Sequence, residues 1–261
     1  MDRFGHTEAV YHRDETQHVM ETTVLASIPY ADWDNSINKL FKDASDGLFL
    51  VITNSTIFYA KGGGQPSDTG TMTSRDQSSI FTVTSVQKLP SGTIMHLGTY
   101  SGAPFEEQTL VTQEINKDTR KLHSQIHDAG HILASAVRRL GIPDLREVKA
   151  QHYPGTAFVD FHGIIPGDRK EEIEQLANQI VNDDRSINVH WWSREELEAK
   201  SWTMPEDSDG QGGLVRAVEI DGKGAYMCGG THVRSTALVG KIRVRKVKRQ
   251  QGISRVSYEL V

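Results

Sequence analysis

The sequence contains a single cysteine, Cys228, among its 261 residues. One cysteine has no partner within the chain, so an internal disulfide is excluded. No apolar run approaches the ~20 residues of a membrane span. The first 15 residues lack the apolar segment of a secretory signal. We therefore expect a cytoplasmic protein without a membrane partner, and leave import into an organelle open.

The bulk composition is that of an ordinary globular protein. Hydrophobic residues make up 37% of the chain and charged residues 24%. The length allows one or two domains with a full core. Internal repeats and low-complexity segments are lacking.

Strand patterns dominate the first part of the chain, to about residue 112. β-Branched and aromatic residues are frequent in the stretches 18–28, 48–60, 79–89 and 92–100, which turn-forming segments such as 61–70 separate. Short strands at this spacing predict a small barrel or sandwich. A short helix is expected over residues 29–43.

The pattern changes after Glu114. Apolar residues recur at steps of three and four in Leu122, Ile126, Ala129, Leu133, Ala136 and Leu140, which predicts a helix over residues 115–141. A second helix is expected at 167–184, and strands at 156–163, 187–192, 214–220, 241–248 and 254–261. The fold class is therefore α+β, with an all-β domain at 1–112 and an α+β domain at 113–261.

Three histidines lie along the predicted long helix at successive i, i+4 steps: His123, His127 and His131. Their side chains share one face of the helix, about one turn apart. Two histidines at this spacing are a common zinc-binding arrangement. One such pair by itself is more often structural than metal-binding.

Cys228 stands four residues before His232, with two glycines between them. A lone cysteine can be a buried filler, a nucleophile or a metal ligand. Gly229 and Gly230 allow a sharp turn that brings the thiolate and the imidazole toward one point. The combination of H-x-x-x-H with C-x-x-x-H favours one bound metal ion.

Positive charge gathers near the C-terminus, although the whole chain carries −5. Eight basic residues stand between Arg234 and Val261, against one acidic residue, Glu259. Such asymmetry indicates a polyanion partner. The alternative is an edge strand whose cations prevent aggregation. On the predicted strand, Arg243 and Arg245 share one face, and with Lys248 they are the candidates for contact with the phosphates of such a partner.

The segments HDAGHIL, CGGTHV and FYAKGGGQPSDTG resemble the signature segments of the freestanding alanyl-tRNA editing proteins, the AlaX family in its medium-length form. That family is similar to the editing domain of alanyl-tRNA synthetase and, more remotely, to that of threonyl-tRNA synthetase. The resemblance implies a small β-barrel followed by a two-layer α/β zinc-containing editing domain, without the large C-terminal domain of longer relatives.

The resemblance also implies site residues. The zinc ligands fall on His127, His131, Cys228 and His232, one ion per chain, and Asp128 stands where many relatives have a hydroxyl residue. His123 lies outside the motif and could line the pocket, contact tRNA or be a plain surface histidine. Gly62, Gly63 and Gly64 could simply form a turn, whereas the resemblance implies that Gly63, Gly64 and Gln65 lie near the tRNA acceptor end. Gln65 and His123 are the candidates for a catalytic role.

The implied activity is that of an aminoacyl-tRNA deacylase. It would hydrolyse tRNA(Ala) mischarged with serine, or with glycine, without an obligate protein partner. A binding pocket made for alanine excludes an added hydroxyl by only about a hundredfold, so a second, hydrolytic site is needed. The metal could activate water, polarise the ester carbonyl or hold the substrate's amino group, and no general base is assigned. Two rival functions are a non-catalytic zinc-stabilised tRNA-binding module and an editor of the threonyl type.

Overall fold

The computed structural model describes residues 4–33, 40–41, 47–201 and 213–261. Two compact units make up the chain. The first consists of residues 1–62 and 66–120, and the second of residues 63–65 and 121–261. The boundary predicted at 112/113 falls within a strand, Leu110–Ile115. None of the described helices is both long and apolar enough to cross a membrane.

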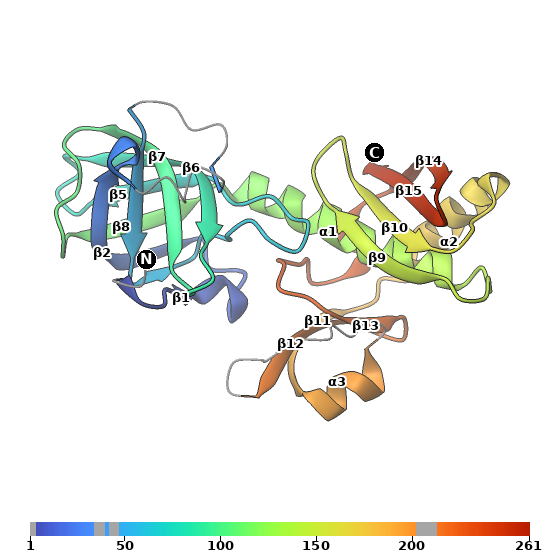
Figure 1. Ribbon diagram of the computed structural model, residues 1–261. Coiled ribbons are helices and arrows are strands. Elements are labelled where there is room, and N and C mark those ends of the chain that lie inside the picture. The colour runs from blue at the N-terminus through green and yellow to red at the C-terminus, as the bar shows by residue number, and fades with distance from the viewer. Residues whose placement is uncertain (1–3, 34–39, 42–46, 202–212) are drawn as a thin grey trace. The chain divides into compact units, whose positions relative to one another are not determined.

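The first unit contains a closed six-stranded β-barrel (Figure 1). Its strands, in the order in which they pair, are β2 (Val19–Pro29), β3 (Phe49–Thr53), β7 (Ile94–Ser101), β6 (Ile80–Lys88), β5 (Gly70–Ser74) and β8 (Leu110–Ile115). All six barrel pairings are antiparallel. Val24, Phe81 and Val83 are among the buried residues that fill its core. The predicted barrel is confirmed.

Two local predictions differ from the barrel as it is observed. The stretch 48–60 is not one strand, because β3 ends at Thr53 and the two-residue strand β4 (Ser55–Thr56) pairs in parallel with β1 (Glu8–Ala9). The predicted helix at 29–43 begins as the 3₁₀ turn Tyr30–Asp32. Most of its remainder, at 34–39 and 42–46, lies outside the described residues.

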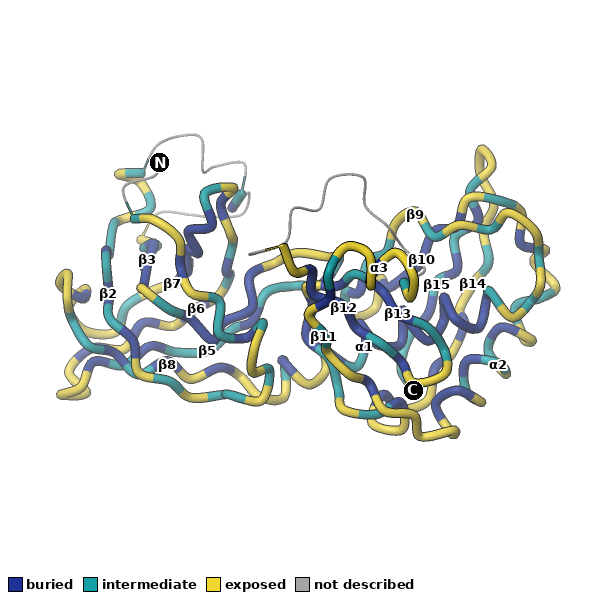
Figure 2. The backbone as a smooth tube through the Cα atoms, turned by 90° about the horizontal axis from the view of Figure 1, so that it is seen from below, coloured by how far each residue is buried: buried dark blue, intermediate teal, exposed yellow. Residues whose placement is uncertain are grey.

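Helix α1 (Lys117–Arg138) is the long helix that the sequence predicts. Every residue from Ile126 to Val137 is buried, as the dark blue of this segment shows (Figure 2). Leu122 was expected on the buried face, but it is 40% exposed. The core of the second unit begins at Ile126, one turn later along the helix.

A four-stranded antiparallel sheet packs against α1 in the second unit. Its strands, in pairing order, are β14 (Ile242–Gln250), β15 (Ile253–Leu260), β10 (Phe158–His162) and β9 (Arg146–Gln151). Helix α2 (Lys170–Asn182) buries Ile173, Ala177 and Ile180 in the same core. Strands β10, β14 and β15 and helix α2 were predicted, whereas β9 was not.

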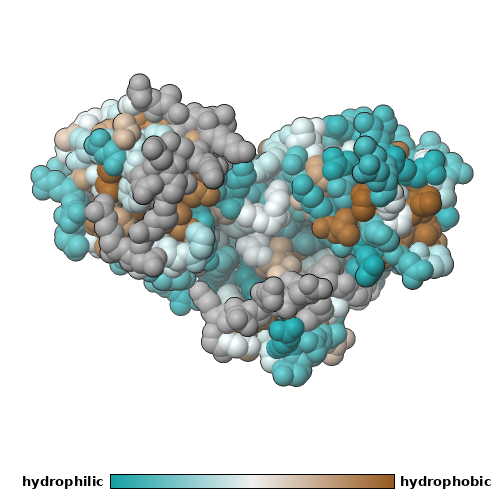
Figure 3. All heavy atoms as spheres, viewed as in Figure 1, coloured by the Kyte–Doolittle hydropathy of each residue, from teal (hydrophilic) through white to brown (hydrophobic). Residues whose placement is uncertain are grey.

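A three-stranded sheet completes the described part of the second unit. Strand β12 (Leu214–Ile220) lies between β11 (Ile187–Ser193) and β13 (Gly224–Met227). Helix α3 (Arg194–Lys200) begins with a capping box between Ser193 and Glu196. Hydrophobic residues on the visible surface form small separate groups (Figure 3).

Candidate metal centre

Four side chains converge in the second unit: His127, His131, Cys228 and His232. Their ligand atoms all lie within 4.8 Å of one another. The Nε2 atom of His127 is 3.3 Å from the sulfur of Cys228. The first pair comes from α1 and the second from the segment after β13, about a hundred residues later. The structure therefore brings together the four residues that the motifs singled out.

The position of Cys228 depends on the turn that follows β13. Its backbone N–H donates to the carbonyl of Arg216 at 3.2 Å, and a guanidinium nitrogen of Arg216 donates to the Cys228 carbonyl at 2.6 Å. The N–H of Gly230 points at the sulfur, 3.4 Å away. A Cβ atom on Gly230 would overlap the ring of His127. Only glycine at position 230 therefore leaves room for the imidazole of His127.

Gln65 is fully buried and fixes the orientation of His127. Its Oε1 atom lies 2.8 Å from Nδ1 of His127 and accepts the N–H of Thr231 at 3.0 Å. Its Nε2 atom donates to the hydroxyl of Thr231 at 2.9 Å. Because an amide oxygen can only accept, Nδ1 carries the proton. The lone pair of His127 on Nε2 is then directed toward Cys228.

Asp128 holds His232 in the same way. One carboxylate oxygen lies 2.6 Å from Nδ1 of His232, and the other accepts the N–H of Val233 at 2.7 Å. Burial acts against a charged imidazole, but Asp128, and after it Cys228, raise the pKa of His232 well above its usual value. A metal ion bound at Nε2 would displace that proton.

A further buried histidine, His152, stacks on His127. The ring centroids are 4.2 Å apart and the planes are nearly parallel. Nδ1 of His152 lies 2.7 Å from the hydroxyl of Tyr258, which donates to the Ile126 carbonyl. Burial, and after it His232, lowers the pKa of His152 to about 3. His152 was not among the predicted site residues, because a single histidine outside the H-x-x-x-H and C-x-x-x-H motifs carries no signal.

The two helix histidines are poor bases in these surroundings. Burial, followed by His152 and His131, lowers the pKa of His127 well below its usual value. Burial, followed by His232 and His152, does the same for His131. Both imidazoles are therefore neutral at pH 7, which is the form that binds a metal.

The donor set fits a metal ion. Nε2 of His131 is buried and makes no hydrogen bond to any residue that the structure describes. A buried polar atom of this kind needs an explanation, and a bound cation supplies one. Three imidazole nitrogens and one thiolate are ligands that zinc accepts in tetrahedral sites.

The other predicted site residues lie in different surroundings. His123 is 7% exposed, so it is not a plain surface histidine. Gly63 is exposed and Gly64 partly so, whereas Gln65 points into the core. Arg243, Arg245 and Lys248 are exposed on β14, and Ile242 and Val244 are buried, as the predicted strand faces require.

Comparison with known families gives two matches. The model for class II (A) tRNA synthetases matches residues 3–119. The model for the second additional domain of threonyl and alanyl tRNA synthetases matches residues 215–257. This second match contains Cys228 and His232.

Curated relatives cover more of the chain. Alanine–tRNA ligases of Halobacterium salinarum and Pyrococcus abyssi are each 30% identical over 256 residues, which is 97% of this chain and 26% of theirs. The ligase of Ignicoccus hospitalis is 33% identical over 218 residues, 80% of this chain and 23% of its own. The chain thus spans about a quarter of the length of these relatives. These matches confirm the resemblance to AlaX-like relatives of alanyl-tRNA synthetase that the signature segments predict.

Proposed function

We propose that the protein is a zinc-dependent aminoacyl-tRNA deacylase that acts in trans on mischarged tRNA(Ala). Serine is the expected amino acid, and glycine the second candidate. The main support for this proposal is the cluster of His127, His131, Cys228 and His232 in a chain that is similar to alanine–tRNA ligases. We place the activity in the cytoplasm as part of the same proposal.

Four residues would hold the zinc ion: His127, His131, Cys228 and His232. When bound, the ion supplies positive charge that can polarise an ester carbonyl or hold a substrate amino group. Since four protein ligands close a tetrahedral site, we favour a role in positioning the substrate.

Gln65 is proposed as a positioning residue for His127 rather than an RNA contact. Both of its amide atoms are already engaged within the protein, with His127 and Thr231. By keeping a proton on Nδ1 of His127, it presents Nε2 to the cluster. Asp128 has the equivalent effect on His232. Gly63 and Gly64, on the exposed side of this segment, stay candidates for contact with the acceptor end.

Release of labelled serine from Ser-tRNA(Ala) tests the proposed activity. Metal-replete protein should deacylate this substrate and spare Ala-tRNA(Ala) and Ser-tRNA(Ser). Cys228→Ala should lose about 10²-fold or more in rate, the scale expected when one electrostatic stabilising group is removed. A protein that binds tRNA(Ala) but leaves Ser-tRNA(Ala) intact would instead be a non-catalytic binding module. Deacylation of mischarged tRNA(Thr), with Ser-tRNA(Ala) left intact, would indicate an editor of the threonyl type.

A further inference from the structure

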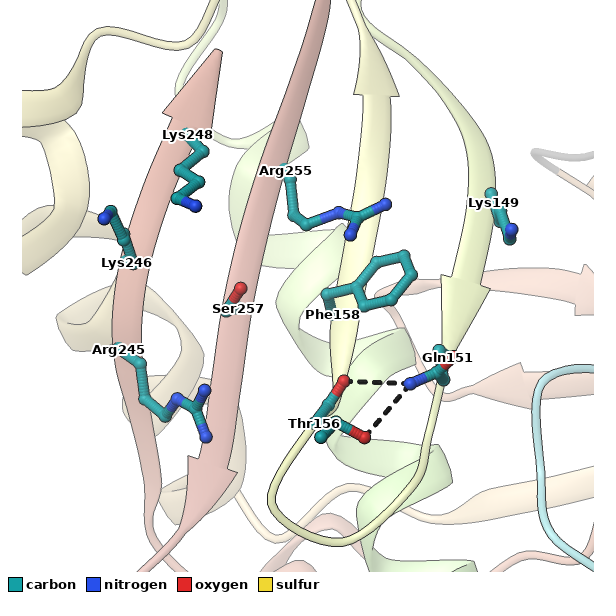
Figure 4. Close-up of a pocket in the computed structure, with 9 residues that line it drawn as sticks. All are labelled: Lys149, Gln151, Thr156, Phe158, Arg245, Lys246, Lys248, Arg255 and Ser257. Carbon is teal, nitrogen blue, oxygen red and sulfur yellow. Dashed lines mark hydrogen bonds between the residues drawn. The ribbon is translucent and has the colours of Figure 1, made fainter. Parts of the chain in front are cut away.

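The four-stranded sheet of the second unit has two chemically different faces. Toward α1 it presents Val159, Phe161, Val244, Val256 and Tyr258, all of them buried. Figure 4 shows the opposite face, with α1 behind the sheet. Two hollows of about 590 and 450 Å³ adjoin there, and both are lined by Lys248 and Arg255.

The larger hollow is lined by five cationic side chains from three of the strands. They are Lys149 on β9, Arg255 on β15, and Arg245, Lys246 and Lys248 on β14. Strand pairing places Lys149 opposite Asp160, Asp160 opposite Arg255, and Arg255 opposite Lys248. Adjacent strands are about 4.8 Å apart, so one row of side chains extends roughly 14 Å across the sheet.

The arginines of this face are already engaged within the protein. Arg255 makes two hydrogen bonds of 2.7 Å with the carboxylate of Asp160, and its guanidinium lies 3.5 Å from the ring centroid of Phe158. Arg245 donates to the Gly155 carbonyl and lies 3.9 Å from a carboxylate oxygen of Glu259. Arg243, next along β14, pairs with the same glutamate at 2.8 Å.

The three lysines differ from the arginines. Lys149, Lys246 and Lys248 are exposed, and none forms an ion pair with a residue inside the described ranges. Lys246 and Lys248 are two residues apart on β14, so their side chains leave the same face about 7 Å apart. In Figure 4 they lie on one side of the hollow, and Lys149 lies on the other. No carboxylate among the described residues pairs with these three positive charges, although the net charge of the chain is −5.

We propose that this face binds the sugar-phosphate backbone of folded RNA at a place remote from the metal centre. We infer RNA as the ligand from charge complementarity. Three lysines that are spread over the face match a row of phosphates better than they match one compact anion. The metal cluster lies on the other side of the sheet: Tyr258 of β15 points to α1 and bonds the carbonyl of Ile126, whereas the neighbouring Ser257 lines the hollow. A bound RNA would therefore have its aminoacylated end at the metal cluster and its backbone contact on the opposite side of the sheet.

The separation has a kinetic consequence. Contacts made equally to the ground state and the transition state lower KM and leave kcat unchanged. The lysines should therefore set the affinity for RNA and its dependence on salt, without affecting the chemical step. Naming tRNA as the ligand rests on the proposed function, whereas the binding itself is measurable without any hydrolysis.

The proposal is tested by measuring the equilibrium affinity of the full chain for tRNA(Ala) without an amino acid, at several KCl concentrations. The triple variant Lys149→Ala, Lys246→Ala, Lys248→Ala should bind about 10- to 100-fold more weakly at low salt. Its slope of log K against log[salt] should be less steep by about 2 to 3. The corresponding triple lysine-to-arginine variant keeps the charges and should bind like the unaltered protein.

A second triple variant serves as the matched control. Arg169→Ala, Arg185→Ala and Arg194→Ala also remove three cations from the second unit, each of which is paired with an acidic side chain. This variant should keep its affinity and slope, and all three variants should keep the circular dichroism of the unaltered protein. In deacylation assays the lysine-to-alanine variant should show a raised KM and an unchanged kcat.

Three results would overturn the inference. One is an unchanged affinity and slope in the lysine-to-alanine variant, and another is an equal loss in the arginine control. The third is that vesicles of phosphatidylserine and phosphatidylcholine, but not RNA, bind through the lysines. If the unaltered protein binds tRNA through this face yet hydrolyses no aminoacyl ester, the proposed function fails and the binding surface stands.

Discussion

Two buried side chains, Gln65 and Asp128, determine which nitrogen of a neighbouring imidazole carries the proton. Each accepts a hydrogen bond from Nδ1, at 2.8 Å for His127 and 2.6 Å for His232. Partners of this kind raise metal affinity because they fix the ring orientation and the tautomer of the ligand.

Gln65→Ala should weaken zinc binding by about 10- to 100-fold, the usual effect of removing such a partner. The change leaves Nδ1 of His127 and the N–H of Thr231 without their shared acceptor. Competition with a chromophoric chelator measures the affinity. Gln125→Ala is the matched control, since that amide bonds the Leu238 carbonyl, and it should bind zinc normally. Equal affinities for both variants would refute the positioning role.

Gly230→Ala should lower the metal content strongly, because the added methyl group overlaps the ring of His127. Elemental analysis of purified protein gives the zinc per chain. Gly167→Ala adds the same methyl group where nothing lies within 4 Å and should retain full occupancy. Full occupancy in Gly230→Ala would mean that His127 is not held where the structure has it.

The four candidate ligands could be predicted from the sequence, but not all of the residues that contact them. Short motifs mark His127 with His131, and Cys228 with His232, because each pair is local in the chain. His152 has no such mark: it follows strand β9, and its backbone N–H donates to the carbonyl of Gly64. Contacts between residues distant in the chain are set by tertiary packing, which local patterns do not contain.

At the scale of elements, the strongest periodicity gave the best prediction. Helix α1 combines apolar spacing with a stop at Gly141 and was predicted nearly end to end. Strand β9, of sequence REVKAQ, has little apolar alternation and was missed. It forms the edge of its sheet, pairing with β10 alone, and a bulge opposite Asp160 and Phe161 interrupts its register.

Strand β9 carries a largely buried carboxyl group, Glu147, on the core side of the bulge. Strand pairing sets it opposite the buried Phe161. Its Oε2 atom makes no hydrogen bond to a described residue. Burial raises its pKa to about 7, and Arg138 opposes that shift only in part.

Glu147→Gln should therefore make stability less sensitive to pH. Because the folded pKa lies above the unfolded value near 4.5, the folded state holds the extra proton, and its stabilisation is lost as pH rises from about 4.5 through 7. Urea unfolding should show the variant gaining on the unaltered protein across this interval, with a constant difference above it. A difference that is independent of pH would show that Glu147 does not titrate there.

At the scale of the whole molecule, the metal cluster belongs to one of the two compact units. All four candidate ligands lie within residues 121–261, and the barrel core is formed by residues of the first unit. Ligands that bind only the folded state stabilise it by about 2.7 kcal/mol at a hundredfold excess over Kd. Metal removal should therefore lower the stability of the second unit and leave that of the barrel unchanged.

A chelator should lower the melting temperature of the second unit and leave the barrel transition in place. Calorimetry with and without added zinc measures both transitions. In Cys228→Ala the melting temperature of the second unit should shift less on chelation than in the unaltered protein, since one of the four candidate ligands is lost. An equal shift of both transitions, or none in the unaltered protein, would contradict metal binding at this cluster.

X-ray absorption at the zinc edge of the purified protein identifies the atoms that bind the metal ion. The proposed function predicts one zinc per chain, bound by three nitrogens at about 2.0–2.1 Å and one sulfur at about 2.3 Å. Cys228→Ala should lose the sulfur signal. A zinc ion bound without sulfur, or protein that takes up no zinc when it is supplied, would contradict this prediction.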